Sequence, residues 1–164
     1  AAKYLNKNRK ISFLFIGEGE KYKDVEDCIQ KERLANVSLF PFQPEALIKY
    51  TLPLADVALV SLDQGMEDLM IPSKSFYYLA AGSAIVAIAN GNSELSDLLG
   101  QRACGVLVPP GDPNALAEAL KSLQANPKKL AMMKNNARRL AEEKFSRQTC
   151  TTEFARVLSQ SDLL

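Results

Sequence analysis

The sequence contains no histidine among its 164 residues. Histidine is the side chain that most often serves as a general base near neutral pH, and it is also the most common metal ligand. Any chemistry that this chain supports must therefore depend on other groups.

Several other features are scarce. The 20 basic residues almost balance the 19 acidic ones, for a net charge of +1, so we expect no nucleic-acid partner, which would need a clustered basic face. No apolar run is long enough to span a bilayer, and no secretory signal opens the sequence. The three cysteines, Cys28, Cys104 and Cys150, show no CxxC spacing. We interpret them as reduced packing residues in a reducing compartment such as the cytoplasm.

Short apolar runs alternate with segments of helical period. The runs predict strands over residues 11–17, 37–40, 56–62, 84–89 and 105–108, and the segments between them predict helices over residues 20–34, 45–54, 72–81 and 93–99. Strands that are apolar on both faces and alternate with helices are typical of a parallel sheet covered on both sides. The predicted fold is an α/β, doubly wound parallel sheet.

The last third of the sequence is helical in pattern. Asp112-Pro113 and Asn126-Pro127 each place an N-cap residue before a proline at the first helical position. Three apolar stripes follow, the last within residues 147–158, so we expect a C-terminal helical tail. The opening residues 1–5 resemble the last turn of a helix, and we expect a first strand to be missing from a single domain of residues 1–164.

In an open parallel sheet, ligands bind beyond the carboxyl ends of the strands. The turn Gly17-Glu18-Gly19 follows the first strand there, and its glycines allow a ligand to approach the backbone closely. A dinucleotide-binding fingerprint would need a third glycine at Tyr22, so that signature fails. An ordinary strand-to-helix turn and a ligand contact are both compatible with this pattern.

A second candidate is the helix that begins with Pro72-Ser73-Lys74-Ser75. The first turn of a helix has free N–H groups and a dipole that favours anions, and hydroxyls and a cation are added here. A diphosphate suits this arrangement, although a serine-capped helix with a solvated lysine has the same pattern. Farther on, Glu94 could cap its own helix or reach a sugar hydroxyl, and we expect capping.

Three segments together resemble one half of the GT-B fold, the C-terminal, donor-binding domain of retaining group 1 (family 4) glycosyltransferases. The first is residues 15–20 followed by residues 37–42. The second is Pro72-Ser73-Lys74 leading into residues 78–82. The third, residues 105–113 with Leu116, Ala137-Arg138 and Phe145-Ser146, is the most specific. The resemblance covers essentially the whole chain.

The resemblance implies a domain that binds a nucleoside diphosphate sugar, usually a UDP-sugar, with no metal and no further cofactor. It places the base near Gly17, Glu18, Gly19, Phe42 and Gln43. The diphosphate would lie on the segment Ile71, Pro72, Ser73, Lys74 and Ser75. The resemblance assigns no catalytic residue in this half, and it implies an N-terminal acceptor domain as partner. By itself the chain is expected to bind donor weakly and to transfer nothing.

The family pattern has two glutamates spaced eight positions apart. In this sequence the corresponding positions are Leu69 and Tyr77, and neither is acidic. The second glutamate usually binds the ribose, so Tyr77 would have to do so with its phenol. This leaves two other hypotheses open: a degenerate, non-catalytic binding or assembly module, and a different nucleotide-binding protein of the flavodoxin-like type, against which the helical tail argues. A biosynthetic role at the inner face of the membrane would suit the family, although no membrane-binding helix is visible in this sequence.

Overall fold

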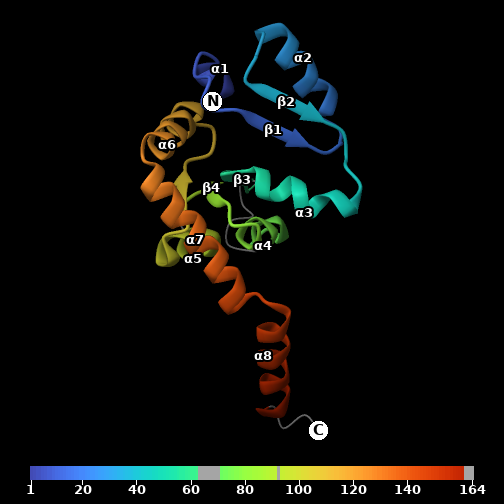
Figure 1. The fold of residues 1–164 in the computed structure, drawn as a ribbon, viewed down its shortest axis with the longest axis vertical. Coiled ribbons are helices and arrows are strands. Elements are labelled where there is room, and N and C mark those ends of the chain that lie inside the picture. The colour runs from blue at the N-terminus through green and yellow to red at the C-terminus, as the bar shows by residue number, and fades with distance from the viewer. Residues whose placement is uncertain (63–70, 92, 161–164) are drawn as a thin grey trace.

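The computed structural model describes residues 1–62, 71–91 and 93–160. Within these ranges all five predicted strands form: β1 (Phe13–Ile16), β2 (Val37–Phe40), β3 (Val57–Ser61), β4 (Ala84–Ile88) and β5 (Gly105–Val108). Every pairing is parallel, as the apolar runs predict. Helices cover the strands, so the α/β prediction is confirmed (Figure 1).

The strands do not form one continuous sheet, which differs from the single sheet predicted above. β1 pairs only with β2, and the other three strands form a separate sheet in the order β3-β4-β5. The physical reason is that no strand lies between β1 and β3, so no hydrogen bonds join the two pieces within the described part of the chain. Figure 1 shows β1 and β2 as a layer apart from β4 and β5.

The helices follow the predicted pattern closely. They are α1 (Ala2–Leu5), α2 (Tyr22–Glu32), α4 (Ser73–Ala80), α5 (Glu94–Arg102), α6 (Pro113–Ala125), α7 (Pro127–Lys144) and α8 (Arg147–Gln160). The predicted helix over residues 45–54 is instead three short turns: η1 (Glu45–Leu47), α3 (Ile48–Thr51) and η2 (Leu52–Leu54). Pro53 lies in the last of them and cannot continue an α-helical hydrogen-bond ladder.

The two caps predicted in the tail are confirmed. The Asp112 carboxylate accepts a hydrogen bond from the Ala115 N–H at 2.8 Å, and the Asn126 side chain accepts one from the Lys129 N–H at 3.0 Å. Both caps precede a proline at the start of the helix. Each side chain satisfies one of the N–H groups that a helix start leaves without a partner.

The core lies on the two faces of the β3-β4-β5 sheet. Along β4 successive side chains alternate between them: Ile85 and Ala87 join one buried cluster with residues of α4, α5 and α7, while Ala84 and Val86 join a second with residues of α1, α6 and α7. All four side chains are fully buried. This alternation is what a doubly wound sheet requires.

Among the cysteines, only Cys104 is buried, and burial raises the pKa of its thiol. Cys28 and Cys150 are exposed. The prediction that all three are packing residues is therefore wrong for these two, because α2 and α8 bury no residue completely.

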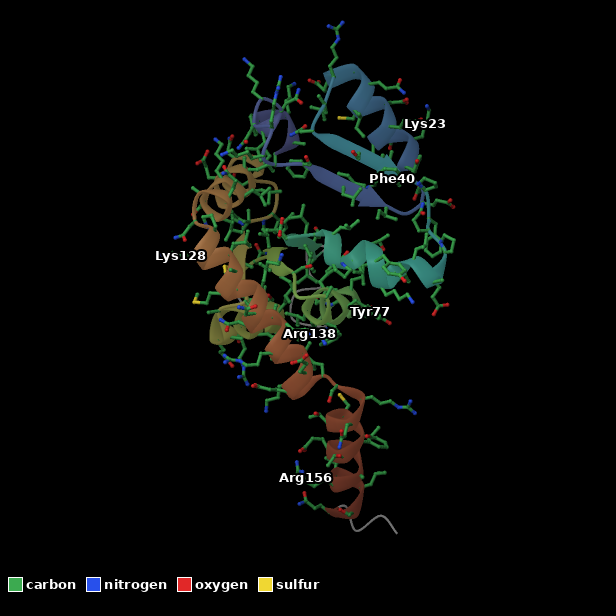
Figure 2. All side chains as sticks on the ribbon, viewed as in Figure 1. Lys23, Phe40, Tyr77, Lys128, Arg138 and Arg156 are labelled. Carbon is green, nitrogen blue, oxygen red and sulfur yellow. The ribbon has the colours of Figure 1, made fainter. Side chains whose placement is uncertain are left out.

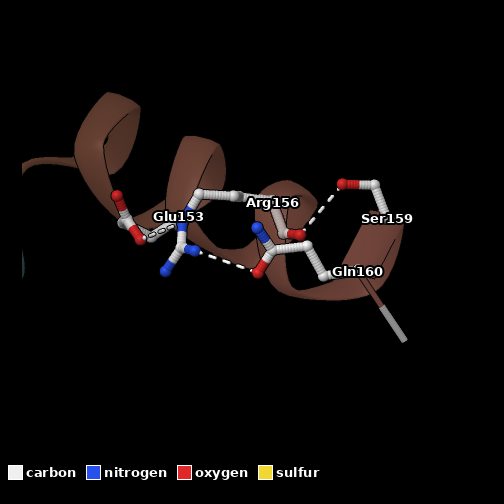
Figure 3. A network of polar contacts seen from close by, with 4 residues as sticks. All are labelled: Glu153, Arg156, Ser159 and Gln160. Carbon is white, nitrogen blue, oxygen red and sulfur yellow. Dashed lines mark hydrogen bonds and ion pairs between the residues drawn. The ribbon is translucent and has the colours of Figure 1, made fainter.

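Helix α8 extends away from the rest of the molecule (Figure 1). Its exposed residues include Phe154 and Val157, with 68% and 55% of their surface accessible. Polar contacts within the helix support it instead: Arg156 pairs with Glu153 at 3.0 Å and donates to the Gln160 side chain at 3.0 Å, while the Ser159 hydroxyl donates to the Arg156 carbonyl (Figure 3). Such pairs add only about 0.2–0.5 kcal/mol each to a helix.

Candidate nucleotide-sugar site

A large groove of about 1740 Å³ lies between β1 and β3. It runs along β1 and is closed by the turns of residues 45–55, by α4 and by the α6–α7 region. Six of the predicted site residues line it: Gly17, Glu18, Phe42, Gln43, Lys74 and Tyr77. Residues from three separate segments of the sequence therefore meet at the carboxyl ends of β1 and β3, where the general rule for parallel sheets places a ligand.

The first of these segments is the turn after β1. The Gly17 N–H donates to the Phe40 carbonyl at 3.1 Å, which joins this turn to the end of β2. Gly17 and Gly19 have φ angles of 151° and 149°, a backbone conformation that favours glycine. An added Cβ at either residue would have nothing within 4 Å, so the approach to this backbone is open.

The loop after β2 presents Phe42 and Gln43. Phe42 is largely exposed, with 69% of its surface accessible. The Gln43 side-chain amide donates to the Pro41 carbonyl at 2.9 Å, which leaves its oxygen as the group available to a ligand. An exposed aromatic ring beside a fixed amide is a suitable surface for a planar base.

The start of α4 forms the third segment. Its N-cap is Pro72, and no side chain of the part of the chain that the structure describes caps the helix. The Ser75 N–H donates to the Pro72 carbonyl at 2.9 Å, so the free amides of this first turn are those of Ser73 and Lys74. Lys74 is exposed and has no ion-pair partner within residues 1–62, 71–91 and 93–160. The amides of this turn, the helix dipole and the Lys74 ammonium group all favour an anion at this end of α4.

The two serines of this segment are in different environments. Ser73 is exposed, whereas Ser75 is completely buried and its hydroxyl has no hydrogen-bond partner among the described residues. Ser75 therefore does not present its hydroxyl on the surface beside Lys74. Ile71 is partly buried and packs against the core, so it anchors the start of α4. Gly19, Ile71, Pro72, Ser73 and Ser75 are not among the residues that line the groove.

Tyr77 follows Lys74 by three positions on α4, which places it on the same face of the helix. It lines the groove and has 62% of its surface accessible (Figure 2). Leu69, the other position where the family pattern has a glutamate, lies outside the described residues.

Sequence reasoning missed the contacts that hold α4 in place. The Arg138 guanidinium of α7 donates to the Ala80 carbonyl at the end of α4, and Arg138 also pairs with Glu142 at 2.6 Å. The rings of Phe76 and Phe145 meet edge to face with centroids 4.7 Å apart. Arg138 and Phe145 both belong to the motif residues quoted above. Their role in the structure is thus to fix the helix that carries Lys74 and Tyr77.

Glu94 is not a cap, which corrects the expectation stated above. The cap of α5 is Ser93, whose hydroxyl accepts a hydrogen bond from the Ser96 N–H at 3.0 Å. Glu94 is the first residue of the helix and is exposed. The sequence pattern Ser93-Glu94 does indicate this cap, because serine is a preferred N-cap residue and acidic residues are favoured in the first helical turn that follows.

No three histidine, cysteine, aspartate or glutamate side chains come together as metal ligands in the described ranges. In the same ranges, no helix is both long and apolar enough to cross a membrane.

Comparison with known proteins identifies the class. Residues 1–140 match the family described as glycosyl transferases group 1, and the chain belongs to this family. The probable glycosyltransferase WbjE of Pseudomonas aeruginosa is 34% identical over 119 residues, which are 73% of this chain and 30% of WbjE. The putative colanic acid biosynthesis glycosyl transferase WcaI of Escherichia coli is 28% identical over 149 residues, 90% of this chain and 36% of WcaI. The chain thus spans about a third of the length of these relatives.

Among solved structures, HepE of Anabaena in complex with UDP aligns with a TM-score of 0.79 at 18% identity, over 97% of this chain and 43% of HepE. HepE in complex with UDP-glucose aligns with a TM-score of 0.77. At this identity the likeness concerns the fold, which is the Rossmann-like half of a GT-B glycosyltransferase.

Proposed function

We propose that this chain is the C-terminal, donor-binding domain of a larger group 1 glycosyltransferase. In this proposal it binds a nucleoside diphosphate sugar, and the whole enzyme transfers the sugar with retention to a glycan or lipid-linked acceptor. The observation that carries the proposal is the convergence of Gly17, Phe42, Lys74 and Tyr77 on one groove at the carboxyl ends of the strands. The UDP and UDP-glucose complexes of HepE support the choice of ligand.

Each side of the groove has a role in this proposal. The base stacks near Phe42, against the open backbone of Gly17, Glu18 and Gly19, and the Gln43 oxygen accepts a hydrogen bond from it. The diphosphate lies on the first turn of α4, where the Ser73 and Lys74 amides and the Lys74 ammonium group donate to its oxygens. The exposed Tyr77 hydroxyl lies one helical turn farther on and binds the ribose.

The same end of α4 would assist the departure of the nucleoside diphosphate. Negative charge grows on the diphosphate as the bond to the sugar breaks, and donors fixed in place beforehand stabilise that charge most effectively. We infer that α4 and Lys74 supply this stabilisation without a metal ion. The acceptor and the remaining catalytic groups would come from an N-terminal domain, and this chain alone would not transfer sugar.

Helix α8 supports the presence of such a partner domain. An isolated helix of 14 residues is marginal in water, and α8 leaves Phe154 and Val157 exposed. We propose that α8 packs against the acceptor domain of the same polypeptide. The name of WcaI, a putative colanic acid biosynthesis glycosyl transferase, suggests a biosynthetic enzyme, which would act in the cytoplasm, where nucleotide sugars are available, or at the inner face of the membrane.

The test is calorimetric titration of the full-length polypeptide with UDP, UMP, GDP and ADP, without divalent metal. We expect UDP to bind more tightly than UMP, because only UDP offers a diphosphate to α4. Lys74→Ala should weaken UDP binding by about 10- to 100-fold, the range for a hydrogen bond to a charged group. UMP binding should change much less.

Lys128→Ala is the matched control. Lys128 occupies the equivalent position in α7, two residues after the N-cap, but there Asn126 caps the helix. Figure 2 shows Lys128 on α7, and it is not among the residues that line the groove. This variant should bind UDP like the wild type. If no nucleotide binds to the full-length polypeptide even at millimolar concentration, the proposal is wrong and the degenerate binding module replaces it.

A further inference from the structure

Helix α4 lies antiparallel against α7, and side-chain contacts fix it near both ends. The Arg138 guanidinium of α7 donates to the Ala80 carbonyl at the end of α4. Nearer the start of α4, the Phe76 ring meets the Phe145 ring edge to face, with the centroids 4.7 Å apart. These contacts run backward along α4 and forward along α7. The first turns of α4 therefore lie beside the end of α7.

The side chains of these first turns divide between two environments. Phe76 is partly buried against Phe145, whereas Lys74 is exposed and lines the groove. Residues two positions apart on a helix do not share a face, which agrees with this division. Ser75, between them, is completely buried. One face of the turn is thus anchored in the protein, and the other presents the proposed diphosphate site.

Phe145 also lies at the junction of α7 and α8. Its N–H donates to the Ala141 carbonyl at 3.0 Å, which closes the last turn of α7. The next residue, Ser146, caps α8: its hydroxyl accepts a hydrogen bond from the Thr149 N–H at 3.2 Å, and its carbonyl accepts one from the Cys150 N–H at 2.9 Å. Two residues held by helix-type hydrogen bonds thus join α7 to α8. The direction of α8 and the position of the Phe145 ring therefore depend on each other.

The rest of α8 contributes little to holding its direction within the described part of the chain. The helix extends away from the others and buries none of its residues (Figure 1). Phe154 has 68% of its surface accessible. Since a helix of this length is marginal in water, α8 needs packing that the described residues do not supply. Whatever covers α8 therefore also affects how the junction at Phe145 is held.

We propose that Phe145 is a positioning residue for the donor site, and that it couples the packing of α8 to the affinity for the diphosphate. With α8 packed, the Phe145 ring supports Phe76 and holds the first turn of α4 where Lys74 meets the diphosphate. With α8 released, this support weakens, and contacts to the diphosphate are lost while those to the base remain. Coupling of this kind is reciprocal, so a bound nucleoside diphosphate also strengthens the packing of α8. The inference rests on the proposed function, in which α4 binds the diphosphate and α8 packs against the acceptor domain.

Phe154→Ala in the full-length polypeptide tests the coupling without nucleotide. Phe154 lies on α8 and is not among the residues that line the groove. We expect the amides of residues 77–80 in α4 to exchange with solvent at least about fivefold faster than in the wild type. Amides of α6 serve as the reference for global stability and should not change. Equal exchange at residues 77–80 in the variant and the wild type would overturn the proposal, whatever the result of the UDP titration.

Met132→Ala is the matched control for this exchange measurement. Met132 lies on α7 and is also an exposed apolar residue, with 50% of its surface accessible, but it is not at the junction. This variant should leave the exchange of α4 unchanged. Acceleration equal to that in Phe154→Ala would mean that loss of any exposed apolar side chain loosens α4, and it would overturn the proposal.

A double variant tests whether the effect passes through Phe145. Phe145→Leu keeps an apolar side chain at this partly buried position but removes the ring that contacts Phe76. In the Phe145→Leu background, Phe154→Ala should add no more than about a twofold acceleration of exchange in α4. If the two effects multiply in full, α8 affects α4 by another route, and the role of Phe145 is wrong.

Titration of the full-length polypeptide with UDP and UMP tests the consequence for the donor site. Phe145→Leu should weaken UDP binding about 5- to 30-fold and leave UMP binding within about twofold. Phe145→Tyr retains the ring and should restore UDP binding. A purely structural role would lower the melting temperature and leave the ratio of UDP to UMP affinity as in the wild type, which would overturn the proposal.

The two measurements also separate this inference from the proposed function. If the wild type binds UDP but Phe145→Leu binds it equally well, only the positioning role of Phe145 fails. If the wild type binds no nucleotide, the proposed function fails and the link to the diphosphate fails with it. The exchange of α4 in Phe154→Ala still decides in that case whether α8 and α4 are coupled.

Discussion

β1 and β4 have equally apolar sequences but very different surroundings. In β4 (Ala84–Ile88) four of the five side chains are fully buried, between the helices on the two faces of its sheet. In β1 (Phe13–Ile16) three of the four side chains are exposed. The comparison shows that an apolar run specifies a strand, while its burial depends on the neighbours that the rest of the fold supplies.

The two regions are also held together by different forces. The β3-β4-β5 sheet has buried apolar clusters on both faces. Phe13 of β1 belongs to one of these clusters, and the β1–β2 layer has further polar contacts with the end of α1: the Asn6 side chain donates to the Arg33 carbonyl at 3.0 Å and accepts from the Ala35 N–H at 2.9 Å. Lys3 pairs with Glu32 at 2.6 Å. Apolar burial is worth more than exposed polar contacts, so the sheet around β4 should dominate stability.

The largest difference in unfolding free energy should appear between two variants, one that truncates a buried side chain and one that truncates an exposed side chain. Ile85→Ala deletes a completely buried side chain of β4 and should cost about 2–5 kcal/mol of unfolding free energy. Phe40→Ala, in β2, removes a ring with 48% of its surface accessible and should cost only about 1 kcal/mol. Urea denaturation of the full-length polypeptide, followed by a probe in this domain, measures both. Equal costs would show that β2 is as buried as β4 in the intact protein.

A smaller difference in unfolding free energy should appear when either of two glycines near the β3-β4-β5 sheet is replaced by alanine. An added Cβ at Gly105 would lie 2.6 Å from the Ile85 carbonyl oxygen and 2.9 Å from a methyl group of Leu99. Because a backbone atom cannot easily move away, Gly105→Ala should cost about 1–3 kcal/mol.

Gly100 is the matched control for Gly105. It lies within α5, has no atom within 4 Å of an added Cβ and no positive φ. Gly100→Ala should therefore raise stability by about 0.4–1 kcal/mol, since alanine restricts the unfolded chain. The same denaturation measurement serves for both variants, and a loss at Gly100 would mean that α5 contacts a part of the polypeptide that the structure does not describe.

Much of the fold follows from the sequence because its signals are local. The strands, the caps at Asp112 and Asn126, and the helix that begins after Pro72 depend on residues close together in the chain. The division into two sheets could not be predicted, since it depends on which strand edges meet. Likewise the site segments were identified one by one, but the burial of Ser75 and the support of α4 by Arg138 are tertiary contacts without a local signal.

The smallest expected effect on stability is that of the ion pair between Lys3 and Glu32, which joins α1 to α2. The hydrogen bond from Lys3, and secondly its positive charge, lowers the pKa of Glu32 below its usual 4.5. In the same way, the hydrogen bond to Glu32 and the negative charge of Glu32 raise the pKa of Lys3 above its usual 10.5. A lowered acid pKa contributes stability that is present above pH 4.5 and is lost as the pH falls through the folded value. A raised lysine pKa contributes stability below pH 10.5 that is lost as the pH rises through its folded value.

Glu32→Gln should therefore lower the melting temperature slightly at pH 7 and low salt, and the difference from the wild type should shrink toward zero as the pH falls through the folded pKa of Glu32. Added salt should reduce the difference at pH 7, because both groups are accessible to solvent. Glu20→Gln, at an exposed position that makes no ion pair with the residues the structure describes, should leave the pH profile unchanged. A Glu32→Gln effect that persists unchanged at pH 3 would show that the β1–β2 layer depends on the shape of this side chain and not on its charge.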